Sequence, residues 1–519
     1  MKKYTVGIFL LMGLVIAMAS SCKKQLEISP RQSIDAGTAL GTREGVEASL
    51  IAIYARLKSA RLYGRDLIAV SEALSDNGVA TNKSGRLLNE AQNNQGATFT
   101  GTIWSSGFGG INQINLTLEA IPQLPPSLNV TATEIARWEG QLYFLRALFN
   151  FEMMKAYAYI PGAVVAANDR GGIPIVTKGI SSADSALNFK PARSTVDESY
   201  THIVADFILA NTRLLNTGSG VAASTANKAG AQGMLARVNL YRKNFSEAKR
   251  WADSCIATAG ARLTTTATYV AGWRAEHHPE ALFQVRFATA VENIGVNESL
   301  QTSFTTLLAP GGTVTGGFGD LVPSLTLLSD LGITLTGGNT LANFALPAAI
   351  ATRSSDIRNL IVEVGTAGRG AATKVETTKF LGKSGVTNLD NVPVIRIAEV
   401  YLSRAEAQVA AGTTVLNVAG ALADLKLIKT RRYTDYVGSA QETADNALVQ
   451  ADLFEEIIRQ RRIELGFEGQ RFFDLKRLGR DLAKAPHYST VAFTDTRILA
   501  PIPQGDVDGN PNLKQNVGY

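Results

Sequence analysis

Apolar residues recur every three or four positions over several long stretches of this chain, which is the spacing of an amphipathic α-helix. In the clearest stretch, Thr131 and Glu134 have the spacing of a capping box, which marks the start of a helix. The apolar residues that follow are Ile135, Trp138, Leu142, Leu145 and Phe149. The pattern predicts a long, well-buried helix that begins at Thr131.

Two further regions predict pairs of helices. In 228–258, a helix leads through the turn KNF into a second helix capped by Asn244 and Glu247. Its apolar face is Ala248, Trp251, Ala252, Cys255 and Ile256. In 393–412, Pro393 lies near the start and Gly412 follows the end of a helix, and another helical stretch follows at 422–432. Such pairs resemble tetratricopeptide units, although no strict 34-residue period is present.

Between 260 and 390 the sequence is rich in Gly, Thr, Ser and Asn, with one short strand candidate at 281–287. The chain is therefore predicted to be mainly α: degenerate tetratricopeptide-like helix pairs with long irregular loops and a few short strands. Loops of this length commonly carry the variable, binding part of a protein surface.

The first residues have the composition of an export signal. A basic tip precedes the apolar run from Val6 to Ala19, and small residues lead to Cys22. This order resembles a bacterial lipobox, although Ala19 stands where leucine is usual. The prediction is a signal peptide over 1–21, lipidation of Cys22 and a polar tether over 22–42. The alternative is an ordinary secretory signal followed by an incidental cysteine; the other cysteine, Cys255, is expected in a helix core.

The overall charge argues against a nucleic-acid-binding role. The formal net charge is +6 with a pI of about 9.1, and it falls to +4 once Lys2 and Lys3 of the signal are set aside. A phosphate-tracking surface concentrates more charge than that. The arginine-rich segment 459–480 has acids and large apolar residues threaded through it, so it is interpreted as a packed helix that ends near Gly466. Its expected charge network is Arg462 with Glu464, and Glu468 with Arg471 and Asp474.

The sequence contains little that indicates catalysis or a metal site. No GxSxG, HExxH or CxxC motif is present. The histidines at 277 and 278 precede a proline, which favours a surface turn over a metal site. Asp506 and Asp508 have calcium-loop spacing, but Pro511 follows and no glutamate closes the loop, so a turn is favoured there as well. No cofactor, metal or enzymatic activity is predicted.

The four tryptophans divide into two kinds. Trp138 and Trp251 lie on apolar helical faces and are expected in the core. Trp104 and Trp273 lie among small or polar residues. The sequence is equally compatible with two roles for each of these rings, as an exposed platform for a sugar or as a half-buried packing residue.

Several segments, in number and in order, resemble the SusD/RagB family of nutrient-uptake lipoproteins of the Gram-negative outer membrane. After Cys22 these segments are LEISP (26–30), SEALSDNG (71–78), GGIPIV (171–176), PARSTVDESYTHIVADF (191–207), LARVNLYRKNFSEAKRWAD (235–253), PVIRIAEVYLSRAEA (393–407), RQRRIELGFEGQRFFDLKRLG (459–479) and PIPQGDVDGNPNLKQNVGY (501–519).

The resemblance implies a mostly helical lipoprotein tethered to the outer leaflet of the outer membrane, with an N-terminal helical region at 43–260 and a C-terminal region with binding loops at 261–519. It implies a SusC-like TonB-dependent barrel as partner, oligosaccharide capture and no catalysis. Six positions could correspond to the ligand-binding residues of the family or supply aromatic rings near them. They are Asp76, Asn77, Arg86, Trp104, Trp273 and Phe318. Ser105, Ser106 and Gly107 follow Trp104, where the family has an asparagine.

Two alternatives stay open from the sequence. The same fold could capture peptides or another nutrient, because aromatic residues are sparse in the loops. A lipoprotein of helical repeats could also serve only to organise partner proteins.

The lipid anchor makes a direct prediction. Replacing Cys22 with alanine should release the protein from membranes, because the acyl chains would have no attachment point. Fractionation of cells and immunoblotting would measure this, with Cys255→Ala as the control that stays membrane-bound. Membrane retention of the Cys22→Ala protein would contradict the anchor.

Overall fold

The computed structural model describes residues 39–99, 102–215, 218–308, 317–367, 372–383 and 385–519. The predicted signal peptide, Cys22 and most of the predicted tether lie outside the described residues. Within the described part of the chain, no helix combines the length and the hydrophobicity needed to cross a membrane.

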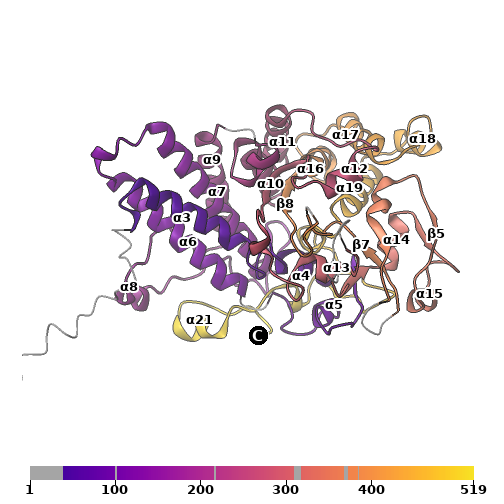
Figure 1. The fold of residues 1–519 in the computed structure, drawn as a ribbon, viewed down its shortest axis with the longest axis horizontal. Coiled ribbons are helices and arrows are strands. Elements are labelled where there is room, and N and C mark those ends of the chain that lie inside the picture. Colours follow the sequence, from indigo (N-terminus) through magenta and orange to yellow (C-terminus); the bar gives the residue numbers. More distant parts are fainter. Residues whose placement is uncertain (1–38, 100–101, 216–217, 309–316, 368–371, 384) are drawn as a thin grey trace, which may run out of the picture.

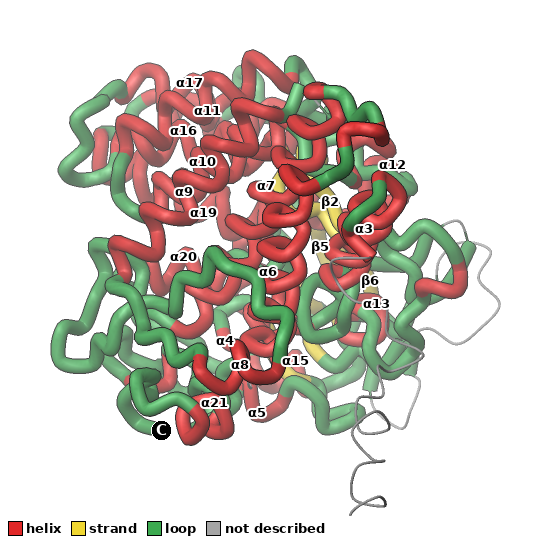
Figure 2. Tube along the Cα trace, turned by 90° about the vertical axis from the view of Figure 1, so that its left-hand side faces the viewer, coloured by secondary structure: helices red, strands yellow, loops and turns green. Residues whose placement is uncertain are grey.

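Long helices pack in succession to form the main body of the molecule. They are α3 (Arg43–Leu57), α6 (Thr102–Ala120), α7 (Ala132–Tyr157), α9 (Val196–Arg213), α10 (Lys228–Tyr241), α11 (Phe245–Ala259), α16 (Ile397–Val409), α17 (Val418–Arg432) and α19 (Gln450–Leu465). Neighbours contact in order, α6 with α7, α7 with α9, α10 with α11, α11 with α16, and α16 with α17 and α19. Figure 2 shows this stack in one half of the molecule. The predicted mainly α, tetratricopeptide-like fold is confirmed.

The helix boundaries follow the local signals in the sequence. Thr131 and Glu134 form a capping box at the start of α7, with each side chain bonded to the backbone of the other. Asn244 caps α11 by accepting from the backbone of Glu247, and Gly466 is the C-cap of α19. These boundaries were all predicted from the sequence.

The other half of the molecule consists of loops with short elements (Figures 1 and 2). Its short helices, together with those that flank the stack, are α4 (Asp66–Leu74), α5 (Leu88–Ala91), α8 (Ala183–Asn188), α12 (Tyr269–Arg274), α13 (Leu300–Phe304), α14 (Leu325–Asp330), α15 (Leu341–Ala345), α18 (Ala440–Asn446), α20 (Arg471–Arg477) and α21 (Gln504–Gly509). The strands form antiparallel pairs: β1 (Gly78–Ala80) with β3 (Leu321–Pro323), β2 (Ala281–Val285) with β8 (Val392–Arg396), β4 (Ile333–Leu335) with β5 (Ile350–Arg353), and β6 (Val362–Val364) with β7 (Val375–Thr377).

The helix predicted from Pro393 begins later than expected. Residues 392–396 form strand β8, which pairs with β2, and the helix α16 starts at Ile397. All five residues of β8 are buried, and its valines and isoleucine favour an extended chain. The pairing partner lies over 100 residues earlier in the chain, so local periodicity could not show it.

A buried network of ion pairs joins the end of α19 to distant segments. Arg432 donates to Glu464 over 2.9 and 3.0 Å, and Arg396 reaches the same carboxylate over 3.0 Å. Arg358 lies 3.5 Å from it, and Glu280 accepts from both Arg396 and Arg432 at 2.7 Å. All five side chains are almost completely buried. Burial alone would raise the pKa of Glu464, but Arg432 and Arg396 hold it well below its usual value.

The residues predicted to form the charge network are all ion-paired, but not with one another. The observed pairs are Arg462 with Asp330, Glu464 with Arg432 and Arg396, Glu468 with Lys379 and Arg396, Arg471 with Asp76, and Asp474 with Arg461 and Arg477. The expected pairs therefore require correction. Residues two apart on a helix, such as Arg462 and Glu464, face different directions, so each finds a partner in another part of the fold.

Removing one member of this network should be costly. Glu468→Ala leaves the buried charge of Lys379 without its carboxylate partner and removes one of the three carboxylates around Arg396. We expect the free energy of unfolding to fall by about 3–5 kcal/mol. Denaturant titration would measure the change. The control is Glu455→Ala, whose exposed pair with Arg480 should contribute below about 1 kcal/mol. An equal decrease in the free energy of unfolding of the two variants would contradict a stabilising role of the network.

Acid should weaken a second buried group of ion pairs, in which Asp474 pairs with Arg461 and Arg477. Burial would raise the pKa of Asp474, but Arg461 and Arg477 lower it from 3.8 to about 2. Because the folded-state pKa is the lower one, the stabilisation is complete above about pH 4 and is lost as the pH falls through about 2. We expect this carboxylate to contribute roughly 2 kcal/mol to that loss. Denaturation curves at decreasing pH should fall less steeply for Asp474→Asn than for the native protein; parallel curves would refute the assignment.

Candidate functional site

Asp76 and Asn77 are buried in contacts within the protein. The Asp76 carboxylate accepts from Arg471 over 2.7 and 2.8 Å. Asn77 donates to Glu72 and accepts from Arg462, each over 2.9 Å. The exposed fractions of Asp76 and Asn77 are 8% and 0%. These two predicted ligand-binding residues therefore present no open polar surface, and they connect α4 and β1 to the end of α19.

Trp273 is also buried, with 2% of its surface exposed, so it is covered more completely than either role considered from the sequence requires. Its ring meets His278 edge-on at a centroid distance of 4.5 Å, and the cations of Lys379 and Arg396 lie 4.7 and 5.3 Å from the ring centroid. The ring thus covers part of the charge network. His278 is 5% exposed, so the predicted surface turn at 277–280 turns one histidine inward.

Trp104 lies in the first turn of α6 and is 4% exposed. Its ring packs edge-on against Phe108 and Tyr157, with centroids 4.8 and 5.1 Å away. It nevertheless lines a pocket of about 490 Å³ between α6, the segment 174–191 and α21. Much of this pocket is apolar, and Phe189, which is 39% exposed, is its most open aromatic side chain. We call it the α6–α21 pocket.

Arg86 and Phe318 come together as a half-buried pair. The guanidinium carbon of Arg86 lies 4.7 Å from the centroid of the Phe318 ring, within the range of a cation–π contact. Arg86 also donates to the side chain of Asn297 over 3.2 Å and lies 3.8 Å from the Asp320 carboxylate. The structure thus brings together two of the predicted site residues at the surface.

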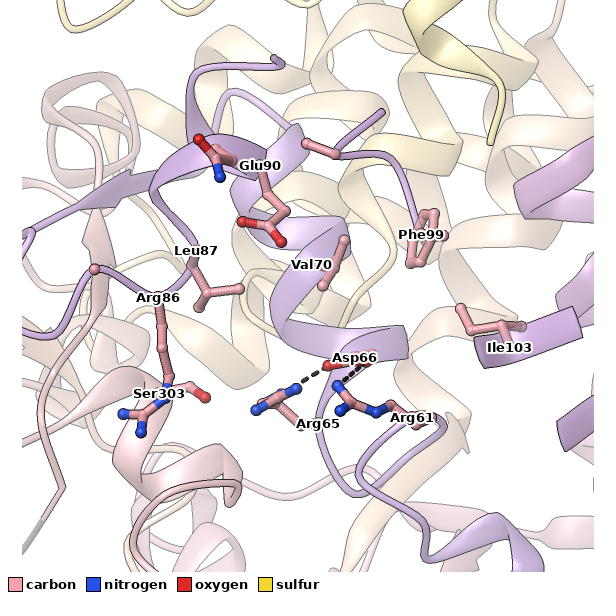
Figure 3. Close-up of a pocket in the computed structure, with 13 residues that line it drawn as sticks. Arg61, Arg65, Asp66, Val70, Arg86, Leu87, Glu90, Phe99, Ile103 and Ser303 are labelled. Atoms are coloured by element: carbon pink, nitrogen blue, oxygen red, sulfur yellow. Dashed lines mark hydrogen bonds and ion pairs between the residues drawn. The ribbon is translucent and has the colours of Figure 1, made fainter. Parts of the chain in front are cut away.

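Arg86 also lines a separate polar pocket, of about 200 Å³, shown in Figure 3. We call it the Arg61 pocket. One wall is the start of α4 with the turn before it, and the opposite wall is the segment 85–97; α6 and α13 close the remaining sides. The lining residues are Arg61, Arg65, Asp66, Val70, Gly85, Arg86, Leu87, Asn89, Glu90, Ala97, Phe99, Ile103 and Ser303.

Hydrogen-bond donors and acceptors are mixed in the Arg61 pocket. Arg65 donates to Asp66 over 2.6 Å, and Arg61 reaches the same carboxylate over 3.4 Å. The Arg61 side chain is 46% exposed, so most of its N–H groups remain open to solvent. Glu90 lies across the pocket from these arginines (Figure 3). Such a set can bind a ligand that carries many hydroxyl groups.

Glu90 differs from the other carboxylates of this region. It is half-buried, and among the residues that the structure describes it has no ion-pair partner. Burial raises the pKa of Glu90 and the nearby charge of Asp66 adds to the rise, while a hydrogen bond from its own backbone and the charge of Arg65 lower it in part. Apart from that backbone bond, its oxygens can accept hydrogen bonds from a ligand.

The sequence did not indicate Arg61, Arg65, Asp66, Asn89 or Glu90 as site residues. They belong to no motif, and in sequence the two walls are separated by the rest of α4 and by β1. The only local signal is that Arg61, Arg65 and Asp66 gather just before α4, a helix in which every residue is buried.

Metal-binding arrangements are not found in the described part of the chain. There, no group of three or more His, Cys, Asp and Glu side chains is placed to hold a metal ion. No histidine or cysteine lines either of the two pockets. The predicted turn at 505–510 is the short helix α21, in which Asp506 faces the α6–α21 pocket.

Two family models match this chain. One, described as "SusD family", matches residues 368–519, and the other, described as "Starch-binding associating with outer membrane", matches residues 27–240. Together they cover more than half of the sequence.

Known proteins match over nearly the full length. The chain is 23% identical to "SusD-like protein P38" of Formosa agariphila, with all of both chains aligned. Among solved structures, a SusD superfamily protein from Bacteroides thetaiotaomicron has a TM-score of 0.74 at 24% identity, covering 92% of this chain and 99% of that one. Surface glycan-binding protein A from Bacteroides fluxus has a TM-score of 0.66 at 20% identity, covering 92% and 100%. These structural likenesses concern the fold.

Proposed function

The chain belongs to the SusD/RagB family, and we propose that it is a lipid-anchored protein of the outer membrane that captures oligosaccharides and delivers them to a SusC-like TonB-dependent transporter. The protein holds the ligand and leaves its chemistry unchanged. Transport belongs to the barrel, and hydrolysis to separate enzymes.

The observation that carries this proposal is the mixed polar lining of the Arg61 pocket. A sugar ring presents neighbouring hydroxyl groups, each of which both donates and accepts hydrogen bonds. Arg61 and Arg86 supply donors, and Asp66 and Glu90 supply acceptors, within one cavity. Hydrogen bonds to charged groups are stronger than neutral ones, so a few of them can hold a well-solvated ligand.

Aromatic side chains near the pocket support the same ligand class. Sugar rings rest their C–H faces on aromatic rings, and Phe318 lies beside Arg86 at the edge of the Arg61 pocket. On the other side of the first turn of α6, Phe189 is partly exposed in the α6–α21 pocket. An extended glycan could therefore meet aromatic rings on either side of this turn.

The proposed location rests on the predicted lipidation of Cys22 and on the description of the family matched by residues 27–240, which associates with the outer membrane. The name of the Bacteroides fluxus relative places that protein at the surface. We propose surface exposure for this chain also, because capture of a polymer must precede its passage through the barrel.

A second candidate ligand is a peptide. The α6–α21 pocket has apolar walls from Val176, Ile180 and Leu513, with Asp506 at its rim. A pocket of about 490 Å³ lies within the usual range for small ligands and could take a hydrophobic side chain. Mass spectrometry of ligands released from protein purified from its native host would distinguish the two: recovered peptides favour this candidate, and recovered oligosaccharides favour the first.

The Arg61 pocket can be tested through Arg86. Calorimetry against a panel of polysaccharides should identify at least one ligand, and Arg86→Ala should weaken its binding at least ~10-fold, because a charged donor worth about 1.5–3 kcal/mol is lost. The matched control is Arg250→Ala, which removes an exposed arginine stacked on Trp251 of α11. It should bind as the native protein does.

Two results would contradict the proposal. Flat traces over the whole panel would argue against glycan capture. Equal affinities of the Arg86→Ala and Arg250→Ala proteins would place the ligand outside the Arg61 pocket.

A further inference from the structure

The arginines of the Arg61 pocket suggest at first an anion-binding site. Arg61, Arg65 and Arg86 all line one small cavity. Guanidinium groups bind carboxylates and sulfates in bidentate geometry, so three of them in a cavity could recognise an acidic sugar. Such recognition requires that carboxylates of the protein do not already compensate the charges of these arginines.

Protein carboxylates already compensate this charge. Arg65 forms ion pairs of 2.6 Å with both Asp66 and Glu298. Arg61 shares Asp66, and Arg86 lies 3.8 Å from Asp320. Each arginine therefore keeps N–H groups for neutral acceptors, but its charge is balanced by at least one acid of the protein.

Glu90 adds a negative charge that forms no ion pair within the described residues, although the charge of Arg65 attracts it from a longer distance. It lines the same cavity and is half-buried, where water screens charges less than at the open surface. An acidic ligand would meet repulsion from Glu90 and from Asp66. A neutral ligand would instead donate its hydroxyls to these carboxylates and accept from Arg61 and Arg86.

We propose that the Arg61 pocket selects uncharged sugar residues and rejects those bearing carboxylate or sulfate groups, with Glu90 as the residue that determines this selectivity. The inference rests on the proposed function, since it concerns the ligand of the same pocket. It narrows the substrate class from glycans in general to neutral glycan segments.

The test uses one polysaccharide in two forms. The probe is a neutral polysaccharide that the native protein binds and that carries free C6 hydroxymethyl groups, together with the same polymer oxidised at C6, in which a carboxylate replaces the hydroxymethyl group. The native protein should bind the neutral form at least ~10-fold more tightly. Glu90→Gln should narrow the ratio of the two affinities several-fold, because the amide keeps an acceptor oxygen but carries no negative charge.

The control is Glu44→Gln, an exposed residue of α3 outside the pocket, which changes the net charge of the protein by the same amount. It should keep the full preference for the neutral form. The dependence of binding on ionic strength provides a second test that needs no variant. Added salt screens the repulsion between the pocket carboxylates and the oxidised polymer, so the affinity of the native protein for this polymer should rise with ionic strength.

The inference is overturned if the native protein prefers the oxidised polymer, if its affinity for that polymer falls with salt, or if Glu90→Gln and Glu44→Gln change the preference equally. None of these results would contradict glycan capture itself. Failure of the native protein to bind any polysaccharide would instead overturn the proposed function, and the selectivity with it.

Discussion

The structure depends on the burial of the Glu464 carboxylate. A buried charge is tolerated only when it is paired and hydrogen-bonded, so the end of α19 is stable only with Arg396 and Arg432 beside it. These arginines come from β8 and α17, and they share Glu280 of the segment before β2. One carboxylate therefore fixes the junction between the helical stack and the loop-rich half. Hydrophobic contacts are non-directional, so the hydrophobic core alone would position this junction less specifically.

The same junction positions the candidate site. Arg462, two residues before Glu464, donates to Asn77, and Arg471 of α20 pairs with Asp76. Asp76 and Asn77 follow directly after α4, whose opposite end carries Asp66 into the Arg61 pocket. Asp76 and Asn77 of SEALSDNG thus lie at the end of α4 that faces away from the pocket and connect it to the arginines. A ligand meets the start of α4 and the segment 85–97, while the network lies beneath the surface.

The sequence predicted those features whose cause is local. A capping box, an asparagine cap and a terminal glycine determine helix ends within one turn, so the limits set by Thr131, Asn244 and Gly466 could be predicted. Strand β8 could not, because its partner β2 is remote in sequence. The burial of Trp273 depends likewise on cations from Lys379 and Arg396, which no spacing reveals. Arg86 and Phe318 could be predicted as site residues through the resemblance to the family. Arg61, Arg65 and Glu90 could not, because only the fold places them around one cavity.

The arginine-rich segment 459–480 is therefore structural, and the proposed ligand site is the Arg61 pocket. Hydrogen exchange with and without a bound oligosaccharide tests this assignment most directly, because the method reports which backbone amides a ligand protects. We expect slow exchange of 459–480 in both states and new protection confined to residues 61–66, 85–97 and 297–303. Ligand-dependent protection within 459–480, with none around the pocket, would contradict this assignment.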